Sequence, residues 1–129
     1  MPFELGSSRG SAPLNFVLVA VPLLLLAFSV VGISLTTLVR NQLVDSAIEG
    51  ARYAALADQT SVDGCARAKA VVVATVAKKL DLQVSCFNTS SLGLEQEVVQ
   101  LTLRVPALGL LPANQLIKAV GHATRELQR

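Results

Sequence analysis

Two cysteines, Cys65 and Cys86, are the residues whose type and spacing first suggest chemistry in this 129-residue chain. Both follow a long uncharged apolar segment. If that part of the chain lies outside the cytoplasm, the oxidising environment favours a disulfide between them. The bridge would close a loop of about twenty residues and stabilise a small domain by roughly 3 kcal/mol. Two buried free thiols in a cytosolic domain and half of a metal site remain alternatives, although the spacing matches no zinc pattern.

The sequence shows no residue pattern that is typical of a catalytic site. His122 is the single histidine, and a lone histidine near the end of a polar segment is usually a surface residue. The sequence has no recognisable nucleophile–base arrangement, no paired carboxylates and no glycine-rich phosphate loop. Asn88-Thr89-Ser90 fits the N-glycosylation pattern, which is short and common by chance. We therefore expect no catalytic residue, no cofactor and no metal site, and we expect that the protein is not an enzyme.

The charged residues are too dispersed to predict a nucleic-acid surface. The net charge is only +2, and the basic residues Arg67 and Lys69 are interspersed with apolar residues and flanked by Asp63 and Asp81. Aromatic residues make up 4% of the chain, so no basic patch with interleaved aromatic side chains is present. We therefore expect no nucleic-acid partner.

One segment, residues 13–39, contains no Asp, Glu, Lys, Arg or His. A membrane-spanning helix needs roughly 20 apolar residues, so this segment is long enough to cross a bilayer. It is longer than the apolar part of a signal peptide, and no small-residue cleavage site follows it. A chain of 129 residues also cannot surround such a segment as a core helix. We therefore predict a retained transmembrane helix over residues 11–39, in contact with a lipid bilayer.

Flanking charges indicate the orientation of this helix. Arg9 precedes the apolar segment and favours a cytoplasmic N-terminus, whereas Arg40 follows the segment and weakens the bias. The position of both cysteines after the segment favours the same orientation, because disulfides form outside the cytoplasm. We therefore expect a single-pass protein with a cytoplasmic N-terminus and an extracytoplasmic C-terminus.

Helical spacing continues beyond the apolar segment. After Arg40, apolar residues recur every three or four positions as far as Ala57. This pattern predicts a helical extension outside the cytoplasm over residues 40–58, followed by a small head domain over residues 59–129, and the fold class is α+β. Within the head we expect a loop at 58–64, a helix at 65–80, strands at 82–87 and 97–105 paired as an antiparallel hairpin about a turn at 88–93, and either a strand or a short helix at 116–127.

Two stretches of the chain resemble a known family. The first is Gly10-Ser11-Ala12-Pro13-Leu14-Asn15-Phe16, and the second is Glu49-Gly50-Ala51-Arg52-Tyr53-Ala54-Ala55 near the end of the long helix. Together with the uncharged run between them, they resemble the TadE-like minor pseudopilins of Tad (Flp-type) pilus systems. The resemblance covers residues 1–57 and reaches the head only in outline. It implies a pilin-like fold, in which a long N-terminal transmembrane helix extends into a small head with a second helix and a short antiparallel sheet.

The resemblance also implies processing at the first stretch. A prepilin peptidase would remove residues 1–10 as a leader by cutting between Gly10 and Ser11, and Phe16 matches the aromatic residue of the family. Asn15 stands where the family has Glu, whose carboxylate pairs with the new N-terminal ammonium of a neighbouring subunit. Asn15 can accept a hydrogen bond from the amine of Ser11 but cannot neutralise its charge. This departure favours a tip, initiating or membrane-retained subunit over a subunit of the filament shaft.

The function implied by the resemblance is structural. The protein would be a minor pilin-like subunit for assembly of a Tad-type pilus or a related secretion apparatus in the bacterial inner (cytoplasmic) membrane, and it would also occur in the pilus. Its partners would be the prepilin peptidase and, through the transmembrane helix, other pilin-like subunits and the pilus assembly platform. The alternative is an unprocessed single-pass envelope binding module, which would keep its first ten residues.

Overall fold

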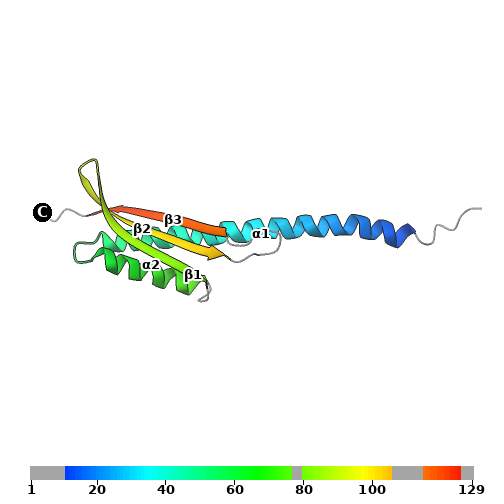
Figure 1. Ribbon diagram of the computed structural model, residues 1–129, viewed down its shortest axis with the longest axis horizontal. Coiled ribbons are helices and arrows are strands. Elements are labelled where there is room, and N and C mark those ends of the chain that lie inside the picture. The colour runs from blue at the N-terminus through cyan, green and yellow to red at the C-terminus, as the bar shows by residue number, and fades with distance from the viewer. Residues whose placement is uncertain (1–10, 77–79, 106–114, 126–129) are drawn as a thin grey trace, which may run out of the picture.

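The computed structural model describes residues 11–76, 80–105 and 115–125 of the chain. The first helix, α1 (Ser11–Ala54), runs through most of the length of the molecule (Figure 1). The remaining elements are α2 (Ser61–Thr75), β1 (Asp81–Ser91), β2 (Leu94–Val105) and β3 (Gln115–Thr124). Only the C-terminal part of α1 is covered by the other elements, and its N-terminal part projects alone (Figure 1). The predicted α+β class is confirmed, with a long apolar helix followed by a small head; residues 1–10 lie outside the described residues.

Helix α1 ends at Ala54, three residues before the predicted end at Ala57. The amide of Ala55 still donates to the carbonyl of Ala51 over 3.0 Å, but the amide of Leu56 instead donates to Tyr53 over 3.3 Å. The second bond spans three residues instead of four, so the chain winds more tightly here and begins the turn that reverses it before α2. The apolar spacing that predicted the longer helix continues through Ala55, which is buried, but Leu56 and Ala57 are exposed in the turn.

Helix α2 begins at Ser61, so the loop predicted at 58–64 is confirmed only for residues 58–60, and the predicted helix start at Cys65 is wrong. Thr60 is the N-cap: its side-chain oxygen accepts from the amide of Asp63 over 3.3 Å, and the Asp63 carboxylate accepts from the amide of Thr60 over 2.9 Å. This reciprocal pair is a capping box, which satisfies two of the backbone donors that a helix start leaves free. The polar residues taken for a loop are therefore the start signal of the helix.

The other end of α2 also differs from the prediction, because the helix stops at Thr75 and Val76 is extended. The predicted end at Leu80 is therefore wrong, although residues 77–79 lie outside the described residues. Three valines at 71–73, followed by Thr75 and Val76, crowd the end of this helix with β-branched side chains. Such side chains lose rotamer freedom in a helix and favour extended backbone.

The three strands form one antiparallel sheet in the order β1-β2-β3. The predicted hairpin is confirmed, but its turn is shorter than predicted, because Ser91 pairs directly with Leu94 and residues 88–91 belong to β1. Leu92 and Gly93 form the two-residue turn, and both have positive φ, as a type I′ hairpin requires. Of the two alternatives for residues 116–127, the strand is correct, and β3 ends at Thr124.

The core lies between one face of the sheet and the two helices (Figure 1). Alternation along each strand turns one set of side chains inward. The inward set on β2 includes Val99, Leu101 and Leu103, which pack with Leu43 of α1 and Val72 of α2. Burying these apolar side chains is the main stabilising contribution to a head of this size.

Candidate functional site: an exposed apolar helix joined to a stapled head

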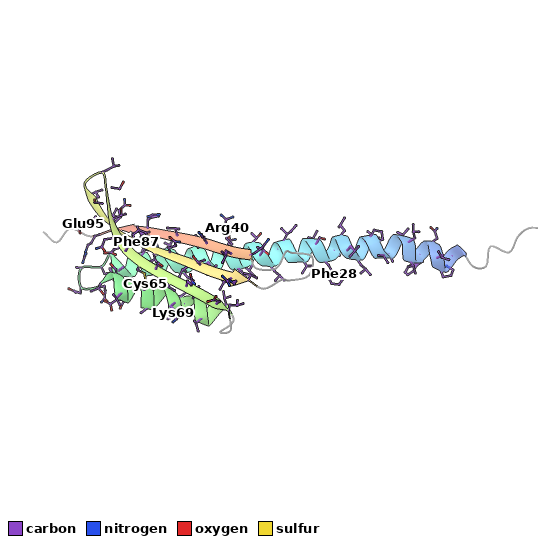
Figure 2. All side chains as sticks on the ribbon, in the orientation of Figure 1. Phe28, Arg40, Cys65, Lys69, Phe87 and Glu95 are labelled. Carbon is purple, nitrogen blue, oxygen red and sulfur yellow. A yellow bond between two sulfur atoms is a disulfide. The ribbon has the colours of Figure 1, made fainter. Side chains whose placement is uncertain are left out.

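The N-terminal part of α1 exposes its large apolar side chains all around the helix (Figure 2). Phe16 is 74% exposed and Phe28 is 69% exposed. The helix is long and apolar enough to cross a membrane, and no part of its most apolar stretch is buried inside the chain. A core helix of a soluble domain would be mostly buried. We call residues 13–39 the apolar stretch; its exposed large apolar residues are Leu14, Phe16, Val17, Leu18, Val19, Val21, Leu23, Leu24, Leu25, Leu26, Phe28, Val30, Val31, Ile33, Leu35 and Leu38.

Hydroxyl groups in the apolar stretch are satisfied within the helix itself. Ser29 donates to the carbonyl of Leu25 over 2.7 Å, and Ser34 donates to Val30 over 2.8 Å. Thr36 and Thr37 make the same bond to the carbonyls four residues earlier, each over 3.0 Å. In lipid, where water cannot satisfy polar groups, these bonds remove the penalty of exposing a hydroxyl. The polar residues of the stretch are thus compatible with an apolar surrounding.

The residues of the predicted processing motif lie at the N-terminal end of α1. Ser11 is the first residue of the helix, and Asn15 and Phe16 lie in its first two turns with exposed side chains. Gly10 lies outside the described residues. A helical start at Ser11 leaves Asn15 one turn along the helix from Ser11. Cleavage by a peptidase stays a prediction.

The C-terminal part of α1 is built from small residues, which let the head approach its backbone. Ala47, Gly50, Ala51 and Ala54 are buried. Gly121 of β3 lies directly on this surface, because a Cβ at that position would collide with the backbone carbonyl of Ala47. The strand therefore contacts the helix backbone without an intervening side chain.

Helices α1 and α2 cross with the same closeness. A Cβ on Gly50 would lie 2.6 Å from the Cβ of Ala68, and one on Gly64 would lie 2.5 Å from the Cβ of Ala54. The stretch Glu49–Ala55, which carries part of the family resemblance, therefore has a physical role: it forms the junction of helix and head. The sequence did not reveal the roles of Gly64 and Gly121, because no local residue pattern around either glycine indicates that it packs against the backbone of α1.

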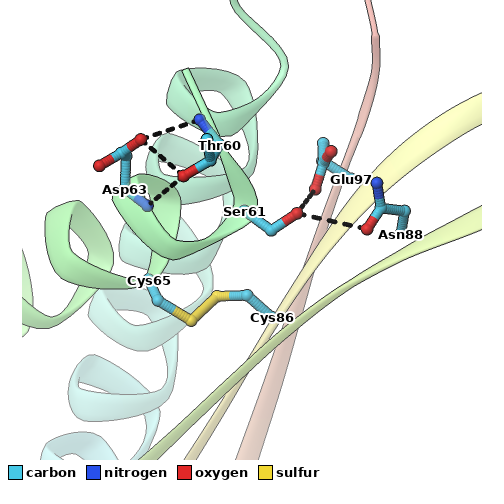
Figure 3. Close-up of a disulfide and its surroundings, with 7 residues drawn as sticks. All are labelled: Thr60, Ser61, Asp63, Cys65, Cys86, Asn88 and Glu97. Atoms are coloured by element: carbon cyan, nitrogen blue, oxygen red, sulfur yellow. Dashed lines mark hydrogen bonds between the residues drawn. A yellow bond between two sulfur atoms is a disulfide. The ribbon is translucent and has the colours of Figure 1, made fainter.

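A disulfide joins Cys65 of α2 to Cys86 of β1, with a Cα–Cα distance of 5.8 Å (Figure 3). The predicted bridge is confirmed, so the alternatives of free thiols and of a metal half-site are wrong. The bridge spans a sequence separation of 21 residues. It fixes the edge strand β1 to the helix that packs on α1, and so it closes the head around the junction.

A buried carboxylate ties together the end of the head that lies farthest from the apolar stretch. Glu97 is only 2% exposed; its Oε2 accepts from the hydroxyl of Ser61 over 2.6 Å, and its Oε1 lies 3.5 Å from a guanidinium nitrogen of Arg125. The same hydroxyl lies 3.3 Å from the amide oxygen of Asn88 (Figure 3). Sequence reasoning missed this network, although strand alternation places Glu97 on the inward face with Val99.

Close by, the hydrogen bonds donated by the side chain and the backbone of Thr60 hold the pKa of Asp63 below its usual value near 3.8. The carboxylate form of Asp63 is thus part of the start of α2. The capping box and the Glu97 network thus place hydrogen-bonded polar groups at this end of the head, beside the exposed apolar side chains of Val62 and Leu92.

A scan against protein-family models, a search of curated proteins and a search of solved structures found no match to the chain. Assignment of a function therefore depends on the motif residues and on the arrangement of the helix and the head.

Proposed function

We propose that the protein is a minor pilin-like structural subunit, anchored in a bacterial cytoplasmic membrane and used in assembling a Tad-type pilus or a related secretion apparatus. The observation that carries the proposal is the division of α1, a 44-residue helix. Apart from Val39, which packs against the core, the large apolar side chains of its apolar stretch are exposed among the described residues, and its remainder forms the spine of the head. A helix with these two parts can occupy a bilayer, or a bundle of like helices, while it holds a folded head outside.

The mechanism is mechanical. A peptidase on the cytoplasmic side removes residues 1–10, and the apolar stretch then packs sideways against the helices of other pilin-like subunits. Because α1 continues without a break into the head, a displacement of the helix carries the head with it. The backbone contacts at Gly50 and Gly121 and the Cys65–Cys86 bridge support this rigid coupling. The disulfide also suits an oxidising compartment outside the cytoplasm.

Asn15 bears on the place of the subunit. In a shaft, each helix would need a partner for the ammonium of the subunit below, and an amide leaves that charge unneutralised in an apolar surrounding. The proposal therefore places the subunit at a tip or starting point, or in the membrane. Retention of the first ten residues would instead favour the unprocessed envelope binding module.

Photocrosslinking from α1 tests the proposal. A benzophenone amino acid replaces Phe16 or Phe28 in the full chain, expressed in cells that assemble the apparatus. The proposal expects adducts with other pilin-like subunits or with the assembly platform. Phe87, on the sheet of the head, is the matched control position and is not expected to give the same adducts. Adducts with lipid alone from both helix positions would contradict a role in assembly and leave only an anchor.

A further inference from the structure

The positions of β3 residues along the long axis can be compared with those of α1 residues, starting from the contact between Gly121 and Ala47. Gly121 touches the backbone of Ala47, and β3 runs in the same direction as α1 (Figure 1). Lys118 lies three strand residues before this contact, which is about 10 Å, or about seven residues of helix. Lys118 is therefore level with Arg40, the first charge after the apolar stretch. By the same measure Leu116 is level with the last turns of the stretch.

The outer face of the sheet carries a shallow groove of about 300 Å³ at this end. Arg104 pairs across the strands with Leu116, and Thr102 pairs with Lys118, so the two cations are diagonal neighbours on one face. Both cations are exposed, and Leu116 is 54% exposed beside them. The groove is lined by Asp81, Gln83, Thr102, Arg104, Leu116 and Lys118, among others.

Within the part of the chain that the structure describes, no ion pair holds either cation of the groove. Among the described residues, the ion pairs join Arg67 to Glu49 and Arg125 to Glu97. Asp81 stands opposite Arg104 in the register but forms no ion pair with it. The guanidinium of Arg104 and the ammonium of Lys118 are thus available to an external anion.

Acidic residues gather at the opposite end of the head. Asp58 follows the end of α1, Asp63 caps the start of α2, and Glu95 and Glu97 lie by the hairpin and the polar network. Arg52 and Arg125 also lie at that end, and Arg125 pairs with Glu97. The cations of the groove, together with Arg40, lie at the end of the head from which the apolar stretch projects.

The apolar stretch fixes where this end would lie in a membrane. Its 27 residues extend about 40 Å at 1.5 Å per residue, whereas the hydrocarbon core of a bilayer is about 30 Å thick. The last turns of the stretch, with Ser34 and Thr36, would therefore lie among the lipid headgroups. The end of the groove at Leu116 lies at the level of these turns, and Lys118 lies about one helical turn beyond them, level with Arg40.

We propose that this groove binds the phosphate-bearing headgroups of anionic phospholipids in the leaflet on which the head rests. Arg104 presents a planar fork of donors that matches phosphate oxygens, Lys118 adds a second positive charge, and Gln83 and Thr102 add hydrogen-bond donors. Leu116 contacts the upper acyl region. This inference depends on the membrane-spanning placement of α1 in the proposed function, but it does not depend on a role in pilus assembly.

Native mass spectrometry of the full chain tests the inference directly. The protein is released from bilayers that contain equal amounts of phosphatidylglycerol and phosphatidylcholine, and the lipids that stay bound are counted. Wild-type protein should retain phosphatidylglycerol in preference. One basic residue near an anionic surface favours binding about fivefold, so Arg104→Gln combined with Lys118→Gln should reduce the preference by about thirtyfold.

The matched control removes the same charge from elsewhere on the head. Arg52 and Lys69 are exposed cations, and neither takes part in the ion pairs of the described residues. Arg52→Gln combined with Lys69→Gln should leave the preference within about twofold of wild type, since lipid attraction falls off within a Debye length of the surface. An unchanged preference in the groove variant, or an equal loss in the control, would overturn the inference.

A crosslinker identifies the occupant of the groove in native membranes. A benzophenone amino acid at Leu116 should yield lipid adducts, and adducts only with an acidic neighbouring protein would overturn the assignment. The groove variant should still resist extraction with carbonate and still crosslink from Phe28. These two readouts report the anchor and the assembly role, so a failure of the lipid site is distinguishable from a failure of the proposed function.

Discussion

The two parts of α1 belong to one continuous helix but present opposite surfaces. Nearly all the large side chains of its apolar stretch are exposed, whereas the residues that the head buries between Leu43 and Ala54 are all small except Leu43. Apolarity alone does not separate them, because Ala and Gly are apolar too. The difference teaches that side-chain size decides which partner each part receives. Large side chains offer area to lipid or to other helices, and small ones let a strand and a helix approach the backbone.

The largest effect is expected from adding a side chain at Gly121, where β3 lies against the backbone of α1. Gly121→Val should destabilise the head by about 4 kcal/mol, because its Cβ meets the rigid backbone of Ala47 and the strand must move off the helix. Urea unfolding of the full chain in detergent, followed by near-ultraviolet circular dichroism, measures the effect. Val120→Ala, on the outer face next to it, should change stability by less than about 1 kcal/mol. A tolerated valine at position 121 would refute the contact.

A matched pair of leucines compares the two parts of α1 directly. Leu43 is 0% exposed and Leu25 is 50% exposed. Leu43→Ala should destabilise the head by about 3.5 kcal/mol through lost burial and the cavity it leaves. Leu25→Ala should leave the unfolding of the head unchanged, because Leu25 is half exposed and lies in the part of α1 outside the head. Equal effects of the two substitutions on urea unfolding would show that the parts are not distinct.

Loss of the disulfide should weaken the head and leave the apolar stretch unaffected. Replacing both Cys65 and Cys86 with Ala should lower the unfolding free energy by about 3 kcal/mol, the value for a loop of this size. The helical circular-dichroism signal of α1 in detergent should persist. Treating wild-type protein with reductant should produce the same loss, and the variant should not respond to reductant. A wild-type head that is indifferent to reductant would contradict the stapling role.

A charge in the middle of the apolar stretch should impair membrane insertion and leave the folding of the head unaffected. Leu24→Arg should disfavour membrane insertion by about 2.5 kcal/mol. The measurement is the fraction of chain that stays in the membrane pellet after carbonate extraction. Asn41→Arg, placed after Arg40, is the control and should insert as wild type does. Full retention of the Leu24 variant would argue that this stretch does not face lipid.

The smallest expected effect concerns the cap of α2 and its dependence on pH. The pKa of Asp63 in the folded head lies below its unfolded value near 3.8, so ionised Asp63 stabilises the fold above that value. This contribution is lost as the pH falls through the folded pKa. Between about pH 5 and pH 3 the wild-type head should therefore lose more stability than Asp63→Asn does. Parallel thermal melts across this range would show equal slopes if the cap made no contribution.

Much of the architecture follows from the sequence, because periodicity and composition are local signals. The apolar stretch and the β1–β2 hairpin were predictable in this way, and the disulfide of Cys65 and Cys86 followed from the expected position of both residues outside the cytoplasm. Local signals failed at the start of α2, where Thr60 and Asp63 resemble loop residues until they are recognised as a capping box. The predicted end of α2 was wrong because the apolar spacing of a helix takes no account of the preference of β-branched residues for extended backbone.

The candidate site was less predictable, because its decisive contacts join residues far apart in the sequence. Gly121 matters only because β3 folds back onto Ala47, and Glu97 is tolerated in the interior only because Ser61 and Arg125 converge on it. These contacts form only in the folded chain, so the local sequence around each residue does not predict them. The groove of Arg104 and Lys118 likewise exists only through the register of two strands.

Intact-mass spectrometry of the protein from native membranes, with and without reduction, tests the central claim most directly. The account predicts a chain that lacks residues 1–10 and begins at Ser11, and that gains the mass of two hydrogens on reduction of the Cys65–Cys86 bridge. Such a mass would join the processed apolar stretch and the stapled head in one molecule. A chain that retains residues 1–10 would contradict processing as a pilin-like subunit and favour the unprocessed envelope module.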